Sequence, residues 1–122
     1  MSGSQDPNAA DLGKVRGELA RLCRRKELRL TAFTPDQPTH WAPMTVANPE
    51  TGLAFTEAGA WEFVAQCLDR GEPIEEVALA MPKGKKGFVM IVPLVHGQSL
   101  YVKLQLGGSG KVFGRSFHIS DR

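Results

Sequence analysis

Apolar residues recur every three or four positions in two early stretches of the chain, which is the spacing of one face of an α-helix. The first stretch spans residues 9–26, and basic residues gather near its end, where cations favour the helix dipole. The second spans residues 56–70, with Thr56 suited to an N-cap and Gly71 suited to end the helix. The pattern therefore predicts two amphipathic helices.

After Gly71 the apolar residues alternate with polar ones, which is typical of half-buried β-strands. Four strands are expected, over residues 74–80, 87–94, 99–106 and 111–119. The connections between them are short, so neighbouring strands should be antiparallel. Residues 28–33 also favour a strand, and the proline-containing segment 34–49 is expected to be a loop with one or two short edge strands.

This order of elements predicts an α+β fold, with two helices packed on one face of a C-terminal antiparallel sheet of about four strands. A chain of 122 residues has the usual length of one domain. Residues 1–8 are polar and without periodicity, so we expect a disordered leader or a cloning remnant there. Residues 9–122 would then form the single domain.

Charge is distributed unevenly along the chain. The net charge is only +2, and the isoelectric point is near 8.7. After Glu76, however, the only acidic residue is Asp121, whereas seven lysine or arginine residues follow. This cationic part of the chain suits a polyanionic partner such as RNA.

The cysteines and histidines are not spaced as metal ligands. Cys23 and Cys67 form neither a CxxC pair nor a cluster with histidine, which favours buried free thiols in a reducing compartment. His40, His96 and His118 are scattered, so we expect no metal and no other cofactor. Because no stretch has the length and apolarity of a membrane span and no signal peptide is visible, we expect a cytoplasmic protein without a membrane partner.

Polar side chains alternate with apolar ones in the last two strands. Tyr101, Lys103 and Gln105 lie on the face opposite the leucines, which must face the core. If the phenylalanines of the last strand also face the core, Ser116 and His118 join this polar face.

Arg115 shares its parity with Phe113 and Phe117, which would place a guanidinium in the core. Glycine within a strand often marks a β-bulge. A bulge at Gly114 would turn Arg115 toward the polar face, and we therefore keep Arg115 as a candidate site residue.

These side chains match the needs of RNA cleavage by transesterification, namely a base, an acid, and cations that stabilise the dianionic phosphorane. Histidine and tyrosine suit the proton transfers, and lysine and arginine suit the charge stabilisation. A lysine-rich connection between two strands would hold flanking phosphates. The candidate catalytic residues are His118, Tyr101, Lys103 and Arg115, and the candidate substrate-binding residues are Gln105, Ser116, Lys83, Lys85 and Lys86.

The segment Leu100–Leu106, the turn after it and the segment Val112–His118 resemble the C-terminal strands of the MqsR-type toxins. Those toxins of bacterial type II toxin–antitoxin systems belong to the barnase, EndoU, colicin and RelE-like ribonucleases. In that family a Tyr-hydrophobic-Lys strand precedes a last strand that ends in Ser-Phe-Lys. Tyr101 matches the functional tyrosine, and His118 stands where the terminal lysine acts, which is a departure from the family pattern.

This resemblance covers about the last third of the chain. It implies a RelE/barnase-like fold and a metal-independent endoribonuclease that cleaves messenger RNA and is neutralised by a cognate antitoxin.

Two other interpretations fit the same residues. A non-catalytic module, such as an immunity or antitoxin-like protein or an RNA-binding domain, needs the basic face but does not need His118. A structural domain of a larger assembly, with the first residues as a linker, needs neither the basic face nor His118. A row of Tyr, Lys and Gln is also typical of the solvated face of a half-buried sheet, so the sequence leaves all these interpretations open.

Overall fold

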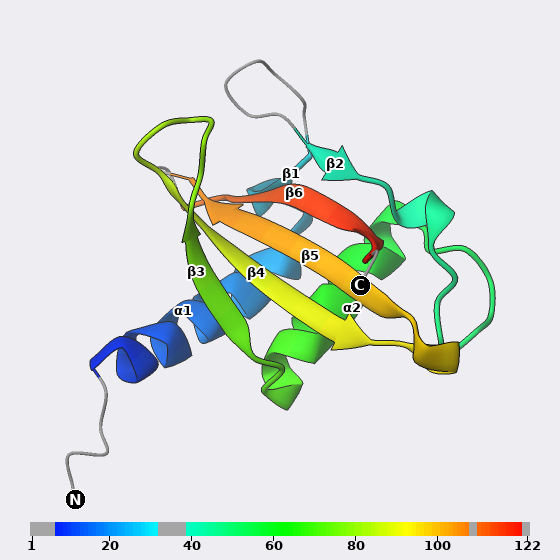
Figure 1. Ribbon diagram of the computed structural model, residues 1–122. Helices are drawn as coiled ribbons and strands as arrows, with labels where there is room; N and C mark the ends of the chain where they lie inside the picture. The colour runs from blue at the N-terminus through cyan, green and yellow to red at the C-terminus, as the bar shows by residue number, and fades with distance from the viewer. Residues whose placement is uncertain (1–6, 32–38, 108–109, 121–122) are drawn as a thin grey trace, which may run out of the picture.

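A computed structural model describes residues 7–31, 39–107 and 110–120 of the chain, and the environment of side chains from residue 12 onward. Two helices lie on one face of a six-stranded sheet, which Figure 1 shows from its open side. The helices are α1 (Pro7–Cys23) and α2 (Glu57–Arg70). The strands are β1 (Arg29–Leu30), β2 (His40–Trp41), β3 (Ile74–Ala78), β4 (Lys86–Pro93), β5 (Ser99–Leu106) and β6 (Val112–Ile119).

The sheet has the order β1-β6-β5-β4-β3, and β2 pairs with β6 beside β1. The four C-terminal strands form an antiparallel meander, as their short connections predicted. The two short strands pair with β6 in parallel, so they cover the edge that β6 would otherwise leave open. The predicted α+β class is therefore confirmed, and the edge strands bring the sheet from about four strands to six.

Local sequence signals define α2 closely. The hydroxyl of Thr56 accepts a hydrogen bond of 2.9 Å from the backbone N–H of Gly59, which caps the helix. At the other end Gly71 has a φ of 89°, a left-handed conformation that glycine adopts without steric cost. The helix spans the predicted residues because these signals lie within its own segment.

Helix α1 differs slightly from its predicted bounds. It begins at Pro7, within the segment expected to be a leader, because proline is well tolerated in the first turn of a helix. It ends at Cys23, and a short 3₁₀-helix, Lys26–Leu28, follows. The other residues expected in the leader, 1–6, lie outside the described residues.

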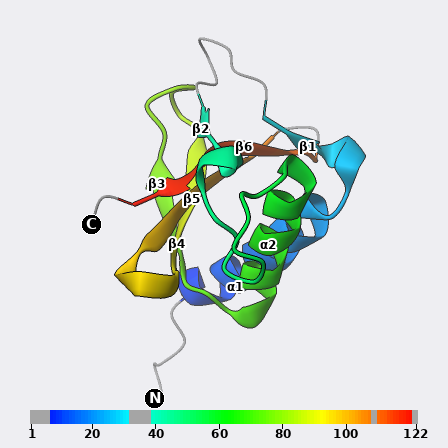
Figure 2. The same cartoon turned by 90° about the vertical axis from the view of Figure 1, so that its right-hand side faces the viewer.

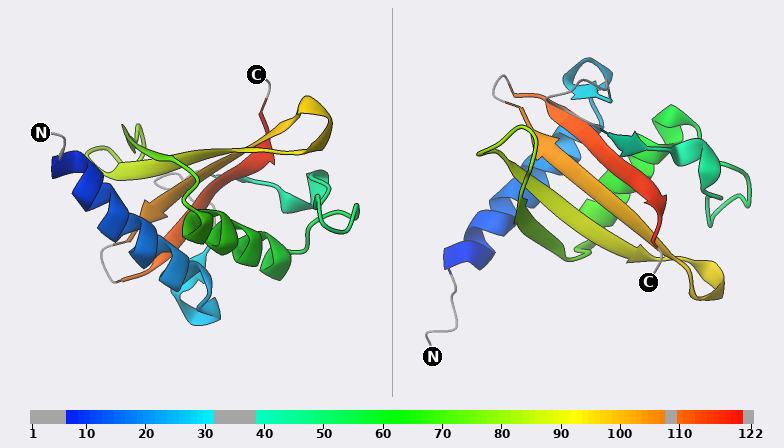
Figure 3. Two further views of the ribbon diagram at one scale, coloured as in Figure 1. Left: turned by 90° about the horizontal axis from the view of Figure 1, so that it is seen from below. Right: turned by 45° about the horizontal axis from the view of Figure 1, so that its top comes forward.

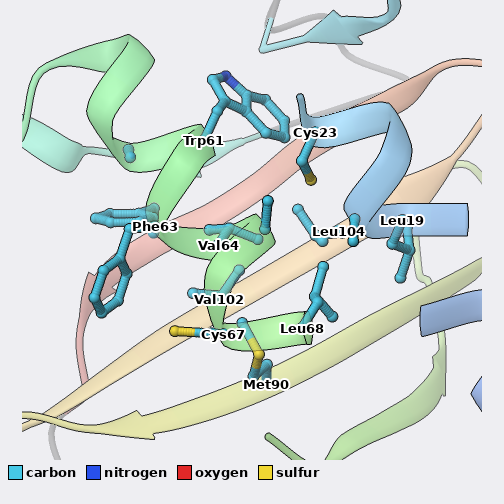
Figure 4. Close-up of a cluster of buried hydrophobic side chains, with 14 of the residues drawn as sticks. Leu19, Cys23, Trp61, Phe63, Val64, Cys67, Leu68, Met90, Val102 and Leu104 are labelled. Atoms are coloured by element: carbon cyan, nitrogen blue, oxygen red, sulfur yellow. The ribbon is translucent and has the colours of Figure 1, made fainter. Parts of the chain in front are cut away.

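Both helices bury their apolar faces against the same side of the sheet, as the side view in Figure 2 and the view from below in Figure 3 show. Trp61, Val64 and Leu68 of α2 meet residues of β4 and β5 in this core, several of which are labelled in Figure 4. Cys23 and Cys67 are buried there as free thiols, as expected from their spacing. Neither α1 nor α2 covers the opposite face of the sheet, and the polar residues lie on that face.

The register between β5 and β6 contains a β-bulge. Lys103 lies opposite Ser116, whereas Leu104 lies opposite Gly114, so Arg115 is the extra residue. Beyond the bulge Phe117 is fully buried in the core, as predicted.

The bulge also corrects one prediction. Phe113 was expected in the core, but it pairs with Gln105 and therefore lies on the polar face. Val112 takes the core position instead and is fully buried. A bulge changes which residues of a strand face the core, because the side-chain period of two is interrupted there.

Candidate functional site

The open face of the sheet brings the predicted polar residues of β5 and β6 together. Tyr101 is paired with His118, and Lys103 is paired with Ser116. Paired residues of neighbouring strands point to the same face, so all four side chains lie on one surface.

Strand β2 adds a residue that the sequence did not single out. His40 is paired with Ser116 in the parallel ladder and is exposed. It therefore extends the row that contains Lys103 and Ser116, while its neighbour Trp41 pairs with Phe117 on the core side. Because β2 and β6 are far apart in sequence, no local pattern could have placed His40 beside the other site residues.

Aromatic packing fixes strand β2 in this position. The ring of Trp41 stacks on that of Trp61 with centroids 4.5 Å apart, and it lies 5.3 Å from the ring of Phe117. Its indole N–H donates a 3.1 Å hydrogen bond to a carboxylate oxygen of Glu57. The Thr39 hydroxyl also donates to carbonyl oxygens of β6. The residues on either side of His40, Thr39 and Trp41, therefore both hold this short strand in place.

Two contacts orient the imidazole ring of His118. Its ring stacks on that of Tyr101, with centroids 5.3 Å apart and planes inclined by 21°. Its Nδ1 lies 2.9 Å from the backbone carbonyl oxygen of Ile119. A carbonyl oxygen can only accept, so Nδ1 carries the proton in this contact, and in a neutral ring Nε2 is then left to accept a proton.

The two histidines line one pocket. It has a volume of about 530 Å³ and is lined by Thr39, His40, Trp41, Ala42 and His118. This pocket is within the size range of small-ligand sites. Two groups capable of proton transfer therefore face one space, although they are 78 residues apart in the sequence.

Arg115 reaches the polar face, as expected of a bulge. One guanidinium nitrogen donates a 2.8 Å hydrogen bond to Oε1 of Gln105, and another donates to the backbone carbonyl oxygen of Met81. The expected bulge near Gly114 is therefore present, with Arg115 itself as the extra residue.

Three residues of this face are more enclosed than expected. Gln105, Arg115 and Ser116 are only 2%, 7% and 4% exposed, respectively. The connection between β3 and β4 lies over part of this face, because Leu79, Ala80 and Met81 line a pocket together with Lys103, Arg115 and Ser116. The expectation of an open face was therefore wrong for Gln105 and Ser116.

This second pocket has a volume of about 320 Å³. It is lined by His40, Ala78, Leu79, Ala80, Met81, Lys103, Arg115 and Ser116. His40 therefore lies between the two pockets. Burial lowers the pKa of Lys103 from its ordinary value, and the positive charge of Arg115 lowers it further. Burial also lowers the pKa of Arg115.

The three lysines predicted to grip phosphates lie at the edge of this region. Lys83 and Lys85 are exposed in the β3–β4 connection, and the Lys86 ammonium lies 3.3 Å from a carboxylate oxygen of Glu76. None of the three lines either pocket. The connection instead contributes the carbonyl oxygen of Met81, and no sequence pattern predicted its hydrogen bond with Arg115.

Among the described residues, no group of three or more His, Cys, Asp or Glu side chains is placed to hold a metal ion. Neither described helix has the length and apolarity needed to cross a membrane. Comparisons of the chain with protein-family models, with curated proteins and with solved structures found no match. The case for a function therefore rests on the residues of the polar face.

Proposed function

We propose that this chain is a metal-independent endoribonuclease that cleaves RNA by transesterification and acts as a toxin neutralised by a cognate antitoxin. The observation that carries the proposal is the pocket lined by both His40 and His118, beside Tyr101 and Lys103. Two imidazoles facing one space supply the base and the acid that this reaction requires.

In the proposed reaction, Nε2 of His118 takes the proton of the 2′-hydroxyl group. The 2′-oxygen attacks the adjacent phosphorus, and the bond from phosphorus to the 5′-oxygen breaks. His40, in its protonated form, gives a proton to the departing 5′-oxygen. The products are a 2′,3′-cyclic phosphate and a free 5′-hydroxyl group, so protons and bonds balance without a metal ion.

The neighbouring residues support these roles. Tyr101 stacks on His118 and limits the orientations of the imidazole ring, and its hydroxyl group is a further proton carrier on the same face. Lys103 lies one row away along β5 and supplies positive charge for the phosphorane. This arrangement assigns proton transfer to two histidines, whereas the sequence pointed to His118 and Tyr101.

A nuclease that acts on cellular RNA would harm its own host, so the proposal includes a partner that blocks the polar face. A cytoplasmic location follows from the same reasoning, because the RNA substrate and the antitoxin would both be there. A non-catalytic RNA-binding or immunity-like module is the rival interpretation. It would use the same basic residues but would not depend on His118.

The test is RNA cleavage by the purified protein in the presence of a chelator, together with growth and RNA integrity after induced expression in bacteria. His118→Ala and His40→Ala should each lower the cleavage rate by about 10²–10⁴-fold, which is the usual contribution of one acid or base. The products of the wild type should end in 2′,3′-cyclic phosphates.

His96→Asn is the matched control. His96 is exposed in the turn Val95–Gly97 with a φ of 59°, a conformation that asparagine tolerates, so this variant should cleave as the wild type does. Wild-type protein that neither cleaves RNA nor slows growth would refute the proposal. Equal cleavage by the wild type and His118→Ala would refute the role of His118.

A further inference from the structure

Arg115 is a buried cation that interacts with neutral groups. It is 7% exposed, and its two hydrogen bonds go to an amide oxygen of Gln105 and a carbonyl oxygen of Met81. A guanidinium has five N–H donors, so three remain for another acceptor. In the part of the chain that the structure describes, no carboxylate forms an ion pair with Arg115.

Lys103 adds a second positive charge to the same pocket. Within the described ranges it also has no carboxylate partner. Glu75 lies in the same row of the sheet, but Val89 separates it from Lys103, so the two are about two strand spacings, or roughly 10 Å, apart. Burial lowers the pKa of Lys103, and the positive charge of Arg115 lowers that pKa further.

The other polar groups of the pocket are suited to an anion. Ser116 lines it, and no hydrogen bond joins its hydroxyl group to another of the described residues, so the hydroxyl is available to a ligand. His40 lines it from β2, and its imidazole ring carries an N–H donor whether the ring is neutral or protonated. The pocket thus offers a guanidinium, an ammonium, a hydroxyl and an imidazole, and none of the lining residues that the structure describes is acidic.

This arrangement is costly without a ligand. Burying a charge that is not neutralised is unfavourable, and two like charges at one site add to the cost. A bound oxyanion would offset both the burial of charge and the repulsion between the two cations. It would do so through charge-assisted hydrogen bonds, for which the planar guanidinium of arginine is particularly suited. At about 320 Å³ the pocket is at the lower end of the range for ligand sites, which fits one phosphate with its sugar.

We propose that the pocket formed by His40, Lys103, Arg115 and Ser116 under the β3–β4 connection is a binding site for one phosphate group of a nucleotide. The oxyanion site stands on its own geometry, and only its use for RNA rests on the proposed function. Along β6, Ser116 and His118 are two residues apart, or roughly 7 Å, a distance comparable to that between successive phosphates of an RNA strand. The pocket therefore holds the phosphate next to the one that the histidines cleave.

The experiment is a titration of the full-length protein with inorganic phosphate, adenosine 3′-monophosphate and adenosine, followed by heteronuclear NMR and calorimetry. We expect phosphate and the monophosphate to bind, with shifts centred on residues 103 and 115–116, and the monophosphate to bind more tightly. Adenosine should not bind measurably. Absence of binding by both phosphate compounds, or equal binding of adenosine, would overturn the inference.

Lys103→Gln should weaken binding of the monophosphate at least tenfold, because the half-buried ammonium is a direct partner. Lys14→Gln is the matched control, since Lys14 is exposed on α1, on the other side of the sheet, and its substitution changes the net charge equally. Arg115→Gln should abolish binding. If that variant does not fold, Arg115→Lys, which keeps the charge and loses the fork, should still bind more weakly than the wild type. Unchanged affinity in Lys103→Gln would refute the site.

His118→Ala separates this inference from the proposed function. It should keep its affinity for the monophosphate, because His118 does not line the pocket. A wild type that binds the monophosphate but cleaves no RNA would refute the proposed function and leave the oxyanion site standing. A wild type that cleaves RNA but binds neither phosphate compound would refute the oxyanion site and leave the proposed function standing.

Discussion

Replacing Gly114 with alanine tests how the candidate site is held together. A Cβ atom at Gly114 would lie 2.6, 2.7 and 2.8 Å from three ring carbons of Trp41. Carbon atoms in normal contact are about 3.5–4.0 Å apart, so the indole ring would have to withdraw by about 1 Å. Because Trp41 anchors β2, this change acts directly on the strand that carries His40.

The expected loss of stability follows from the contacts of Trp41. Its withdrawal weakens the stacking on Trp61, the contact with Phe117 and the hydrogen bond to Glu57. Aromatic pairs contribute about 0.5–1.5 kcal/mol each, and overpacking in a filled site costs about 1–3 kcal/mol. We therefore expect Gly114→Ala to lower the free energy of unfolding by about 2–3 kcal/mol. For a domain of this length that corresponds to a fall in Tm of about 8–12 °C.

Thermal and denaturant unfolding followed by circular dichroism will measure this loss. The exciton signal of the stacked indoles should weaken in the same variant, and RNA cleavage should fall with it if His40 is displaced. Gly17→Ala is the matched control, because Gly17 is in α1 with nothing within 4 Å of its added Cβ. Alanine in a helix should stabilise the protein there by about 0.5–1 kcal/mol. A Tm of Gly114→Ala at or above that of the wild type would refute the reasoning.

Two further predictions concern the core beneath the site. Glu57→Ala should lower the free energy of unfolding by about 1–3 kcal/mol, because the Glu57 carboxylate accepts hydrogen bonds from the indole N–H groups of Trp41 and Trp61, and Trp61 is a buried residue. A denaturation curve of this variant that overlays the wild-type curve would contradict the prediction. Burial raises the pKa of the Cys23 thiol to about 12 and that of Cys67 to about 11, so both should react slowly with a thiol reagent at pH 8 and rapidly after denaturation. Rapid reaction of either thiol in the native protein would show that it is not buried.

The sequence determined those features that depend on neighbouring residues. Helix α2 lies where its cap, its apolar face and its terminal glycine predicted it, since each signal acts within one or two turns. The four C-terminal strands follow from alternation and short connections, and β5 spans the predicted residues 99–106. The composition of the polar face was also readable, because one strand alternates between core and exposed positions.

Only the tertiary structure decided how those residues form pockets. The pairing of β2 with β6 brings His40 to the site, and it depends on aromatic contacts between segments far apart in the chain. The bulge at Arg115 moved Phe113 out of the core, and the folded chain buries Gln105 and Ser116 on the polar face. Register, bulges and burial depend on contacts between distant segments, and the free energies of these contacts exceed the weak local preferences of the residues involved.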